Sequence, residues 1–278
     1  MGLTNEIGIM QGRLSPRIDG KIQAYPASTW QKEFEIAQEI GYAAIEWIVE
    51  KPVETNALMT DSGKAEIKKV IASTGVRIDY VCADIFMQQP LVRMTEEIKS
   101  QNKDYLLEIL KNAKEVGAIG VEIPFVDNSS IKNDKEKHEF IDAMQDAFKL
   151  AKDLDIKISL ETDLSPIAFK ELLEQIDLDF IQANYDIGNS ASLGFDPEEE
   201  LDAYGQRILN VHVKDRKLGG TTVPLGTGNA KIDLVIQKLQ EFGYSGGLTM
   251  QAARGVNDVE TAKEQLNYVR NLLNNKNE

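Results

Sequence analysis

The chain reads I-L-N-V-H-V-K-D-R from Ile208 to Arg216. Its first six residues are mostly apolar, which predicts a buried strand, and the run then changes to charge at Lys214, Asp215 and Arg216. His212, one of only 2 histidines in the 278-residue chain, lies inside the apolar part. A strand that breaks into polarity at its carboxyl end is typical of parallel α/β proteins, which hold their ligands there.

Strand-like and helix-like segments alternate on both sides of this stretch. The helices have apolar residues at i, i+4 and i+7, as at Trp30, Phe34 and Ala37, and end at residues such as Gly41. Strands are predicted at 7–10, 43–49, 77–85, 119–126, 157–163, 180–187, 208–216 and 247–251. Helices are predicted at 30–40, 61–73, 95–116, 134–154, 166–176, 197–204, 232–242 and 259–273.

Eight strand–helix units in about 250 residues predict a (β/α)8 TIM barrel of the α/β class. No proline- or serine-rich linker and no change of composition divides the chain, so a single domain over residues 1–278 is expected. The alternative is a doubly wound open sheet. Such a sheet usually carries a glycine-rich fingerprint after its first strand, and the segment M-Q-G-R-L-S-P that begins at Met10 lacks that pattern.

The composition limits the partners of the protein. The formal net charge is −14, and both nucleic acids and anionic membranes need a basic surface, so neither is expected as a partner. A small anionic substrate stays open, because a few local Lys and Arg side chains can hold one. The single cysteine, Cys82, cannot form an internal disulfide and fits a reducing compartment. We see no signal-peptide pattern and no run of about 18 apolar residues, and therefore expect a cytoplasmic protein.

Catalytic groups of a TIM barrel lie at the carboxyl ends of its strands. The polar residues near these predicted ends are Glu46, Glu122, Glu161, Asp186, His212 and Gln251. The last four fall on consecutive strands, and neighbouring strands lie about 5 Å apart, so their side chains can converge on one cation. Carboxylate, imidazole and amide donors suit Mn²⁺, Mg²⁺, Co²⁺ or Zn²⁺ and exclude soft Cu(I).

Structural interpretations compete with this one. A lone histidine on a strand is more often a hydrogen-bonded core residue than a ligand, and an acid at a strand end often caps the following helix. Glu46 and Glu122 either line the pocket or pair with Arg13, and Trp47 is placed at the floor of a sugar pocket. The four residues together favour a metal site, because buried unpaired carboxylates are costly without a cation.

Several segments resemble one known family, in order along nearly the whole chain. They are G-I-M-Q-G-R-L-S-P from Gly8, A-A-I-E-W from Ala43, L-E-T-D from Leu160, Y-D-I-G-N from Tyr185, H-V-K-D-R from His212, P-L-G-T-G-N from Pro224 and G-Y-S-G-G-L-T-M-Q from Gly243. Their order and spacing resemble the sugar-phosphate isomerase/epimerase superfamily with the xylose-isomerase-like TIM barrel. That superfamily includes ketose 3-epimerases, hydroxypyruvate isomerase and inosose dehydratase.

The resemblance implies a divalent-metal site and proton chemistry next to a carbonyl. The family holds its metal with Glu, Asp, His and Glu, which correspond here to Glu161, Asp186, His212 and Gln251. Mn²⁺ is the favoured ion, with Mg²⁺, Co²⁺ and Zn²⁺ as alternatives. The first and last acids of the family set also move protons, which marks Glu161 and Gln251 as the catalytic positions. Arg216 resembles a family residue that reaches substrate oxygens.

Gln251 departs from the family pattern. An amide oxygen can coordinate a cation, but it cannot take a proton at neutral pH, and the site loses one negative charge. Epimerisation in this family uses acids on both faces of the sugar, whereas aldose–ketose isomerisation needs one base, which Glu161 supplies. We therefore favour an isomerase over an epimerase, unless Asp215, Glu46 or Glu122 replaces the missing acid.

The leading hypothesis is a divalent-metal-dependent isomerase/epimerase of a sugar or sugar phosphate, acting by proton abstraction next to a carbonyl through a metal-stabilised enediolate. Lys214, Glu46 and Trp47 are expected to bind substrate together with Arg216. The alternatives are an inosose-dehydratase-like lyase and a barrel with a decayed site that binds a sugar or supports a complex. The DNA-repair branch of the superfamily needs a histidine cluster and a basic face, which this chain lacks. The resemblance also suggests a homodimer or homotetramer.

Overall fold

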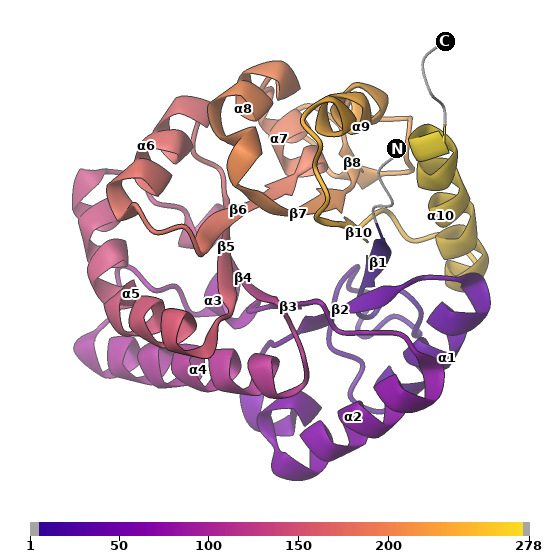
Figure 1. Cartoon of the computed structure of the whole chain (residues 1–278), viewed down its shortest axis with the longest axis horizontal. Coiled ribbons are helices and arrows are strands. Elements are labelled where there is room, and N and C mark those ends of the chain that lie inside the picture. Colours follow the sequence, from indigo (N-terminus) through magenta and orange to yellow (C-terminus); the bar gives the residue numbers. More distant parts are fainter. Residues whose placement is uncertain (1–5, 275–278) are drawn as a thin grey trace.

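Parallel strands close into a barrel. The computed structural model describes residues 6–274. The barrel strands are β1 (Ile7–Met10), β2 (Ala44–Ile48), β3 (Tyr80–Cys82), β4 (Gly120–Phe125), β5 (Lys157–Thr162), β6 (Ile181–Asp186), β7 (Ile208–Val213) and β10 (Gly247–Met250). They are hydrogen-bonded in the order β1-β10-β7-β6-β5-β4-β3-β2, and β2 pairs with β1 to complete the ring (Figure 1). The predicted TIM barrel is therefore confirmed.

Helices form a ring around this barrel (Figure 1). The longer ones are α1 (Trp30–Ile40), α2 (Asp61–Thr74), α4 (Glu96–Glu115), α5 (Asp134–Leu154), α6 (Pro166–Ile176), α8 (Pro197–Tyr204), α9 (Ile232–Glu241) and α10 (Asp258–Asn274). Shorter turns are α3 (Ile85–Gln88), α7 (Ile187–Leu193) and the 3₁₀ segments Val53–Thr55, Ala57–Met59, Asp127–Ser129 and Gly205–Arg207. Between residues 6 and 274, none of the helices combines the length and the apolar character that a membrane span requires.

Local sequence explains where these helices begin and end. The Ser165 hydroxyl accepts a hydrogen bond from the Ala168 N–H, and Pro166 takes the first position of α6, where its missing N–H costs nothing. Helix α1 ends at Gly41, whose φ of 99° lies in the left-handed region that favours glycine. The sequence placed these two boundaries correctly.

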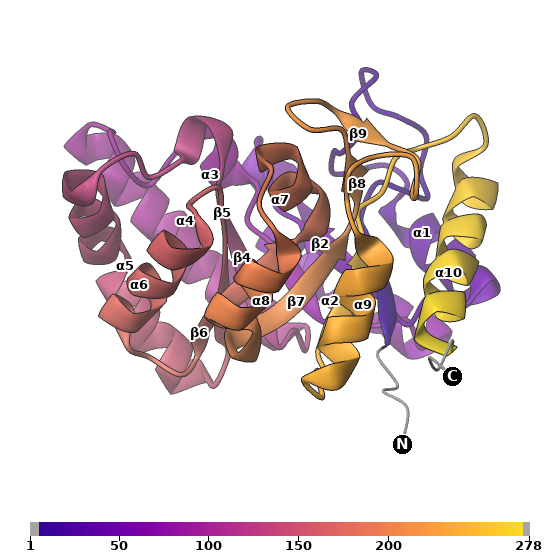
Figure 2. The ribbon, with the colours of Figure 1, turned by 90° about the horizontal axis from the view of Figure 1, so that it is seen from above.

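The carboxyl ends of the strands carry short elements that the sequence did not predict. The third strand ends at Cys82 because the chain turns into α3, and the sixth ends at Asp186, whose carboxylate caps α7 by accepting the Asn189 N–H. Beyond β7, residues Asp215–Arg216 (β8) pair antiparallel with Thr222–Val223 (β9) instead of continuing the barrel strand. Figure 2 shows this hairpin at the same end of the barrel as α3 and α7.

Side chains alternate between the two sides of each barrel strand, as the period of 2 requires. On β2, Trp47 points outward and packs against Trp30 of α1, with 5.2 Å between the ring centroids. Its neighbour Glu46 points the other way and meets His212 of β7 inside the barrel. This alternation decides which residues of a strand can reach the interior.

Candidate active site

Five ionisable side chains meet inside the barrel, near the carboxyl ends of the strands. They are Glu46 from β2, Glu122 from β4, Glu161 from β5, Asp186 from β6 and His212 from β7, and each is at most 5% exposed. The parallel register sets Asp186 beside His212. The structure thus brings together Glu161, Asp186 and His212, as expected from their positions on consecutive strands.

The imidazole of His212 stands between two pairs of carboxylates. Its Nε2 atom lies 3.1 Å from Glu46 Oε2 and 3.4 Å from Glu122 Oε2. Its Nδ1 atom lies 3.4 Å from Glu161 Oε2 and 3.9 Å from Asp186 Oδ2. The two ring nitrogens therefore face two separate acidic groups, and the imidazole between them is fully buried.

Charge is unevenly distributed over this cluster. Burial would lower the pKa of His212, but the surrounding carboxylates outweigh it and raise the pKa well above its usual value. Burial would also raise the pKa of Glu161, yet hydrogen bonding and attraction from His212, with help from Lys214, lower it to about 2. The pKa of Glu122 is raised well above its usual value, because burial and the charges of Glu161 and Glu46 outweigh the attraction from His212.

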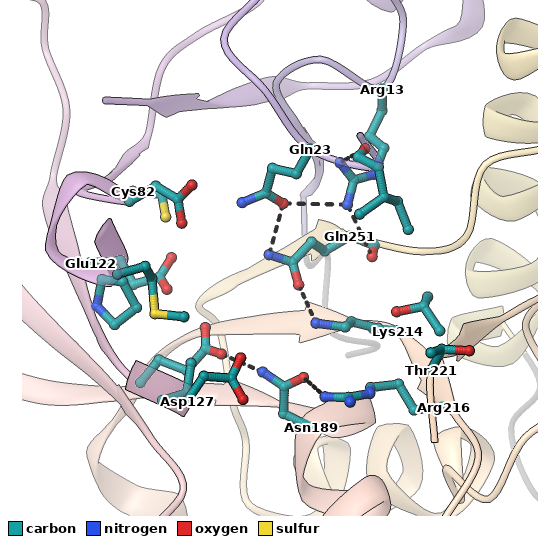
Figure 3. Close-up of a pocket in the computed structure, with 17 residues that line it drawn as sticks. Arg13, Gln23, Cys82, Glu122, Asp127, Asn189, Lys214, Arg216, Thr221 and Gln251 are labelled. Carbon is teal, nitrogen blue, oxygen red and sulfur yellow. Dashed lines mark hydrogen bonds between the residues drawn. The ribbon is translucent and has the colours of Figure 1, made fainter. Parts of the chain in front are cut away.

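Lys214 and Gln251 form a polar bridge across the opening of the barrel (Figure 3). The Lys214 ammonium donates to Asp186 Oδ2 and to Gln251 Oε1, each at 2.9 Å. Gln251 Nε2 in turn donates to Gln23 Oε1 at 3.2 Å, and Arg13 donates to the same oxygen. Gln251 is therefore held at both ends of its amide. The sequence did not point to Gln23, which lies in the long loop after β1.

Arg216 and Asn189 make a second connection from the rim to the acids. Arg216 Nη1 donates to Asn189 Oδ1 at 2.8 Å, and its Nε and Nη2 donate to the Gly220 carbonyl. Asn189 Nδ2 donates to Glu161 Oε1, while Asn184 Nδ2 donates to Glu161 Oε2 at 3.2 Å. Both oxygens of Glu161 are thereby fixed. Asn189 belongs to the Y-D-I-G-N segment, which is the signal that could have identified it.

A cavity of about 610 Å³ opens above these residues. Figure 3 shows five residues that face it from different strands, loops and helix α7: Glu122, Lys214, Arg216, Asn189 and Gln251. A volume of this size suits a small metabolite. Its position at the carboxyl ends of the strands is the usual one for the ligand site of a TIM barrel.

Some residues considered from the sequence lie elsewhere. Trp47 is fully buried outside the barrel wall, where its Nε1 donates to Asn56 Oδ1, and it does not line the cavity. Glu46 lies beneath the cavity and does not line it either. Asp215 accepts the backbone N–H groups of Gly228 and Ala230, so its carboxylate fixes the turn after β9.

The buried cluster offers two sets of donors for a divalent cation. Glu161, Asp186 and His212 each offer one ligand atom within 4.8 Å of the others, and so do Glu46, Glu122 and His212. Buried Glu46 Oε1 and Glu122 Oε2 find no hydrogen-bond partner in the described part of the chain, so the cluster holds more negative charge than its neighbours balance. Two carboxylates with an imidazole suit a divalent cation, and we find that these residues fit one.

Glu161, Asp186 and His212 suit a divalent cation better than the group of Glu46, Glu122 and His212. Glu161 lines the cavity, so an ion beside it would be open to substrate. With His212 Nδ1 turned to the ion, Nε2–H would donate to Glu46, an arrangement that commonly orients metal-bound histidines. Gln251, the fourth residue expected at the metal, has its amide oxygen on Lys214 instead.

The fold and the site define a TIM barrel with a buried carboxylate–histidine cluster beneath a cavity at the carboxyl ends of its strands. Residues 34–272 match the family described as xylose isomerase-like TIM barrel, and the chain belongs to that family. The resemblance drawn from the sequence segments is therefore confirmed.

Relatives and solved structures agree with this assignment. L-ribulose-5-phosphate 3-epimerase UlaE from Salmonella heidelberg (strain SL476) is 25% identical over 234 residues, which cover 81% of this chain and 82% of the relative. The IOLI protein with a binding zinc atom has a TM-score of 0.78 at 15% identity and covers 96% of this chain and 98% of its own. D-psicose 3-epimerase with D-tagatose, from Clostridium cellulolyticum H10, has a TM-score of 0.74 at 14% identity, with coverages of 96% and 99%. The relative UlaE is thus named as an isomerase-class enzyme of a sugar phosphate, and the solved structures share the fold.

Proposed function

We propose that the protein is a divalent-metal-dependent sugar isomerase/epimerase that abstracts a proton next to a carbonyl. The observation that carries the proposal is the convergence of Glu161, Asp186 and His212 beneath the cavity. The family assignment and the epimerase relatives support the same reaction class. Mn²⁺ is the ion we favour, and Mg²⁺, Co²⁺ and Zn²⁺ suit the same donors.

Glu161, Asp186 and His212 are the residues that would hold the ion. When bound, a divalent cation supplies positive charge that polarises the carbonyl of the substrate. Glu161 is also the base in this proposal, because it faces the cavity and its two oxygens are oriented by Asn184 and Asn189. Orientation of this kind lets one carboxylate receive a proton at a defined position.

Gln251 favours isomerisation over epimerisation. Its amide cannot act as an acid or a base at neutral pH, and its oxygen is held by Lys214. Asp215 cannot take over, since two backbone N–H groups occupy its carboxylate. One base on one face of the substrate is sufficient for proton transfer between neighbouring carbons. We therefore expect aldose–ketose interconversion.

Exchange of substrate hydrogen with solvent tests the reaction directly. Aldoses and ketoses, free and phosphorylated, are incubated in D₂O with the Mn²⁺-supplemented protein and followed by NMR. We expect deuterium at the carbon next to the carbonyl, and a rate at least about 100-fold lower in Glu161→Gln, as for loss of a general base. Glu171→Gln, on the exposed face of α6, is the matched control. If no sugar exchanges, or if Glu161→Gln exchanges normally, the proposal is wrong.

One observation supports a second candidate, a barrel that binds a sugar without turning it over. The Lys214 ammonium already lies between Asp186 and Gln251, so a protein cation partly balances the site. Gln251→Glu separates the two candidates, because it restores an acid at this position. Inert wild type with an active Gln251→Glu variant would establish the decayed site, whereas active wild type excludes it.

A further inference from the structure

The charge of the substrate can be inferred from the walls of the cavity. UlaE, one of the relatives of this chain, is named for a phosphorylated sugar. A cavity that binds a phosphate group needs cationic or N–H donors that are not already paired with protein acceptors. The cations that line this cavity are Arg13, Lys214 and Arg216. Whether they are available decides between a phosphorylated and an uncharged sugar.

The Arg13 side chain is hydrogen-bonded within the protein. It is 6% exposed, and each of its three side-chain nitrogens donates to a protein acceptor. These acceptors are the carbonyl oxygens of Ile22 and Ala252 and the side-chain oxygen of Gln23. The guanidinium therefore ties the loop after β1 to the end of β10.

The other two cations also donate to protein acceptors. Each nitrogen of the Arg216 guanidinium donates to Asn189 or to the Gly220 carbonyl. Lys214 forms an ion pair with buried Asp186 at 2.9 Å, which balances its charge. A phosphate that binds Lys214 would have to compete with Asp186 for the ammonium, and breaking such a buried pair is costly.

The opposite wall of the cavity is acidic. Half-buried Asp84, at the start of α3, and exposed Asp127, after β4, both line it, as do the buried residues Glu122 and Glu161. Figure 3 shows Glu122 and Asp127. Neither the Asp84 nor the Asp127 carboxylate has a hydrogen-bond or ion-pair partner among residues 6–274. Burial, with the charges of Glu50 and Glu161, raises the pKa of Asp84 to about 6. Burial is the largest cause of this raised pKa, and it outweighs the opposing charges of Lys21 and Arg13.

We propose that the substrate is an uncharged sugar whose hydroxyl groups donate to Asp84 and Asp127, and that this wall repels phosphorylated sugars. The inference rests on the proposed function, because it names the substrate class of the same site. Unpaired carboxylates are strong acceptors for sugar hydroxyls, and the same charges disfavour a phosphate dianion. Asp84 is thus a residue that determines specificity.

Calorimetry at pH 8 with free ketopentoses and ketohexoses, their terminal phosphates, and inorganic phosphate tests the inference. We expect a free sugar to bind at least about tenfold more tightly than its phosphate, and inorganic phosphate not to compete. Asp84→Asn should lower the ratio of the two affinities, free sugar over sugar phosphate, several-fold, because the sugar phosphate binds more tightly to the variant. Asp153→Asn, an equal charge change on the exposed face of α5, should leave it unchanged.

The outcomes separate this inference from the proposed function. Tighter binding of a sugar phosphate or of inorganic phosphate by wild type would overturn the inference, and so would an Asp84→Asn variant with an unchanged ratio. Failure to bind any free sugar would overturn it as well. If the protein binds the free sugar but the hydrogen of the sugar never exchanges with solvent, the proposed function is wrong. The inference about the charge of the substrate would still hold.

Discussion

Glu33 of α1 is a buried acid whose ionisation should be visible in the stability of the protein. The side chain is 1% exposed, and its oxygens accept the backbone N–H groups of Gly12 and Leu14, at 3.1 and 3.0 Å. These two residues flank Arg13, which holds Gln23 beside Gln251. The perturbation we consider is Glu33→Gln, which keeps the shape of the side chain and removes its titration.

The magnitude follows from the pKa of Glu33. Burial outweighs the two backbone hydrogen bonds and raises the pKa from 4.5 to about 7. The folded chain then binds this proton more tightly than the unfolded chain, so the contribution is fully present below pH 4.5 and is lost as the pH rises through 7. With about 1.4 kcal/mol for each pH unit, wild type should lose about 2–3 kcal/mol from this group between pH 5 and pH 8.

Urea unfolding at pH 5 and pH 8, with chelator present, measures this effect. Groups that titrate elsewhere contribute equally to wild type and to Glu33→Gln, because sites without shared contacts are close to additive. We expect the free energy of unfolding of wild type, relative to the variant, to fall by about 2–3 kcal/mol over this range. Parallel pH profiles for the two proteins would refute the argument that burial dominates at Glu33.

Two further substitutions test the placement of β2 residues. Glu46→Gln removes the carboxylate that faces His212 Nε2, and we expect Mn²⁺ binding measured by calorimetry to weaken about 10–100-fold; unchanged affinity would contradict a role in orienting His212. Trp47→Phe leaves Asn56 without its indole partner, and we expect a loss of about 1–3 kcal/mol in urea unfolding with an unchanged KM, since Trp47 does not line the cavity. A raised KM would place Trp47 at the substrate after all.

The barrel could be predicted because its signal repeats. Each of the eight units carries its own apolar strand and amphipathic helix, and an error at one boundary changes nothing elsewhere. The site positions at Glu161, Asp186 and His212 follow from the same logic, because parallel strands end at one face of the barrel. The prediction that Trp47 binds substrate considered only the end of the strand and not the side of the strand, and Trp47 does not line the cavity. It follows Glu46 directly, so the alternation of side chains along a strand sends the two residues to opposite sides.

Other features depend on contacts that sequence spacing does not contain. Gln23 reaches Gln251 over a separation of 228 residues, through a loop with no periodic pattern. The turn of Gln251 toward Lys214, and the pairing of β8 with β9, are likewise set by tertiary packing. Asp84 could not be recognised as a cavity residue because its strand was expected to continue to residue 85, whereas the chain bends into α3.

Titration of metal-stripped protein with Mn²⁺ tests the central claim most directly, namely that Glu161, Asp186 and His212 hold one divalent cation. Calorimetry on wild type, Asp186→Asn and His212→Gln should show one ion bound per chain in wild type and affinity at least about 100-fold lower in both variants. Circular dichroism of each variant verifies that the barrel is folded. Wild type that binds no Mn²⁺, or folded variants that bind it as tightly as wild type, would contradict the account.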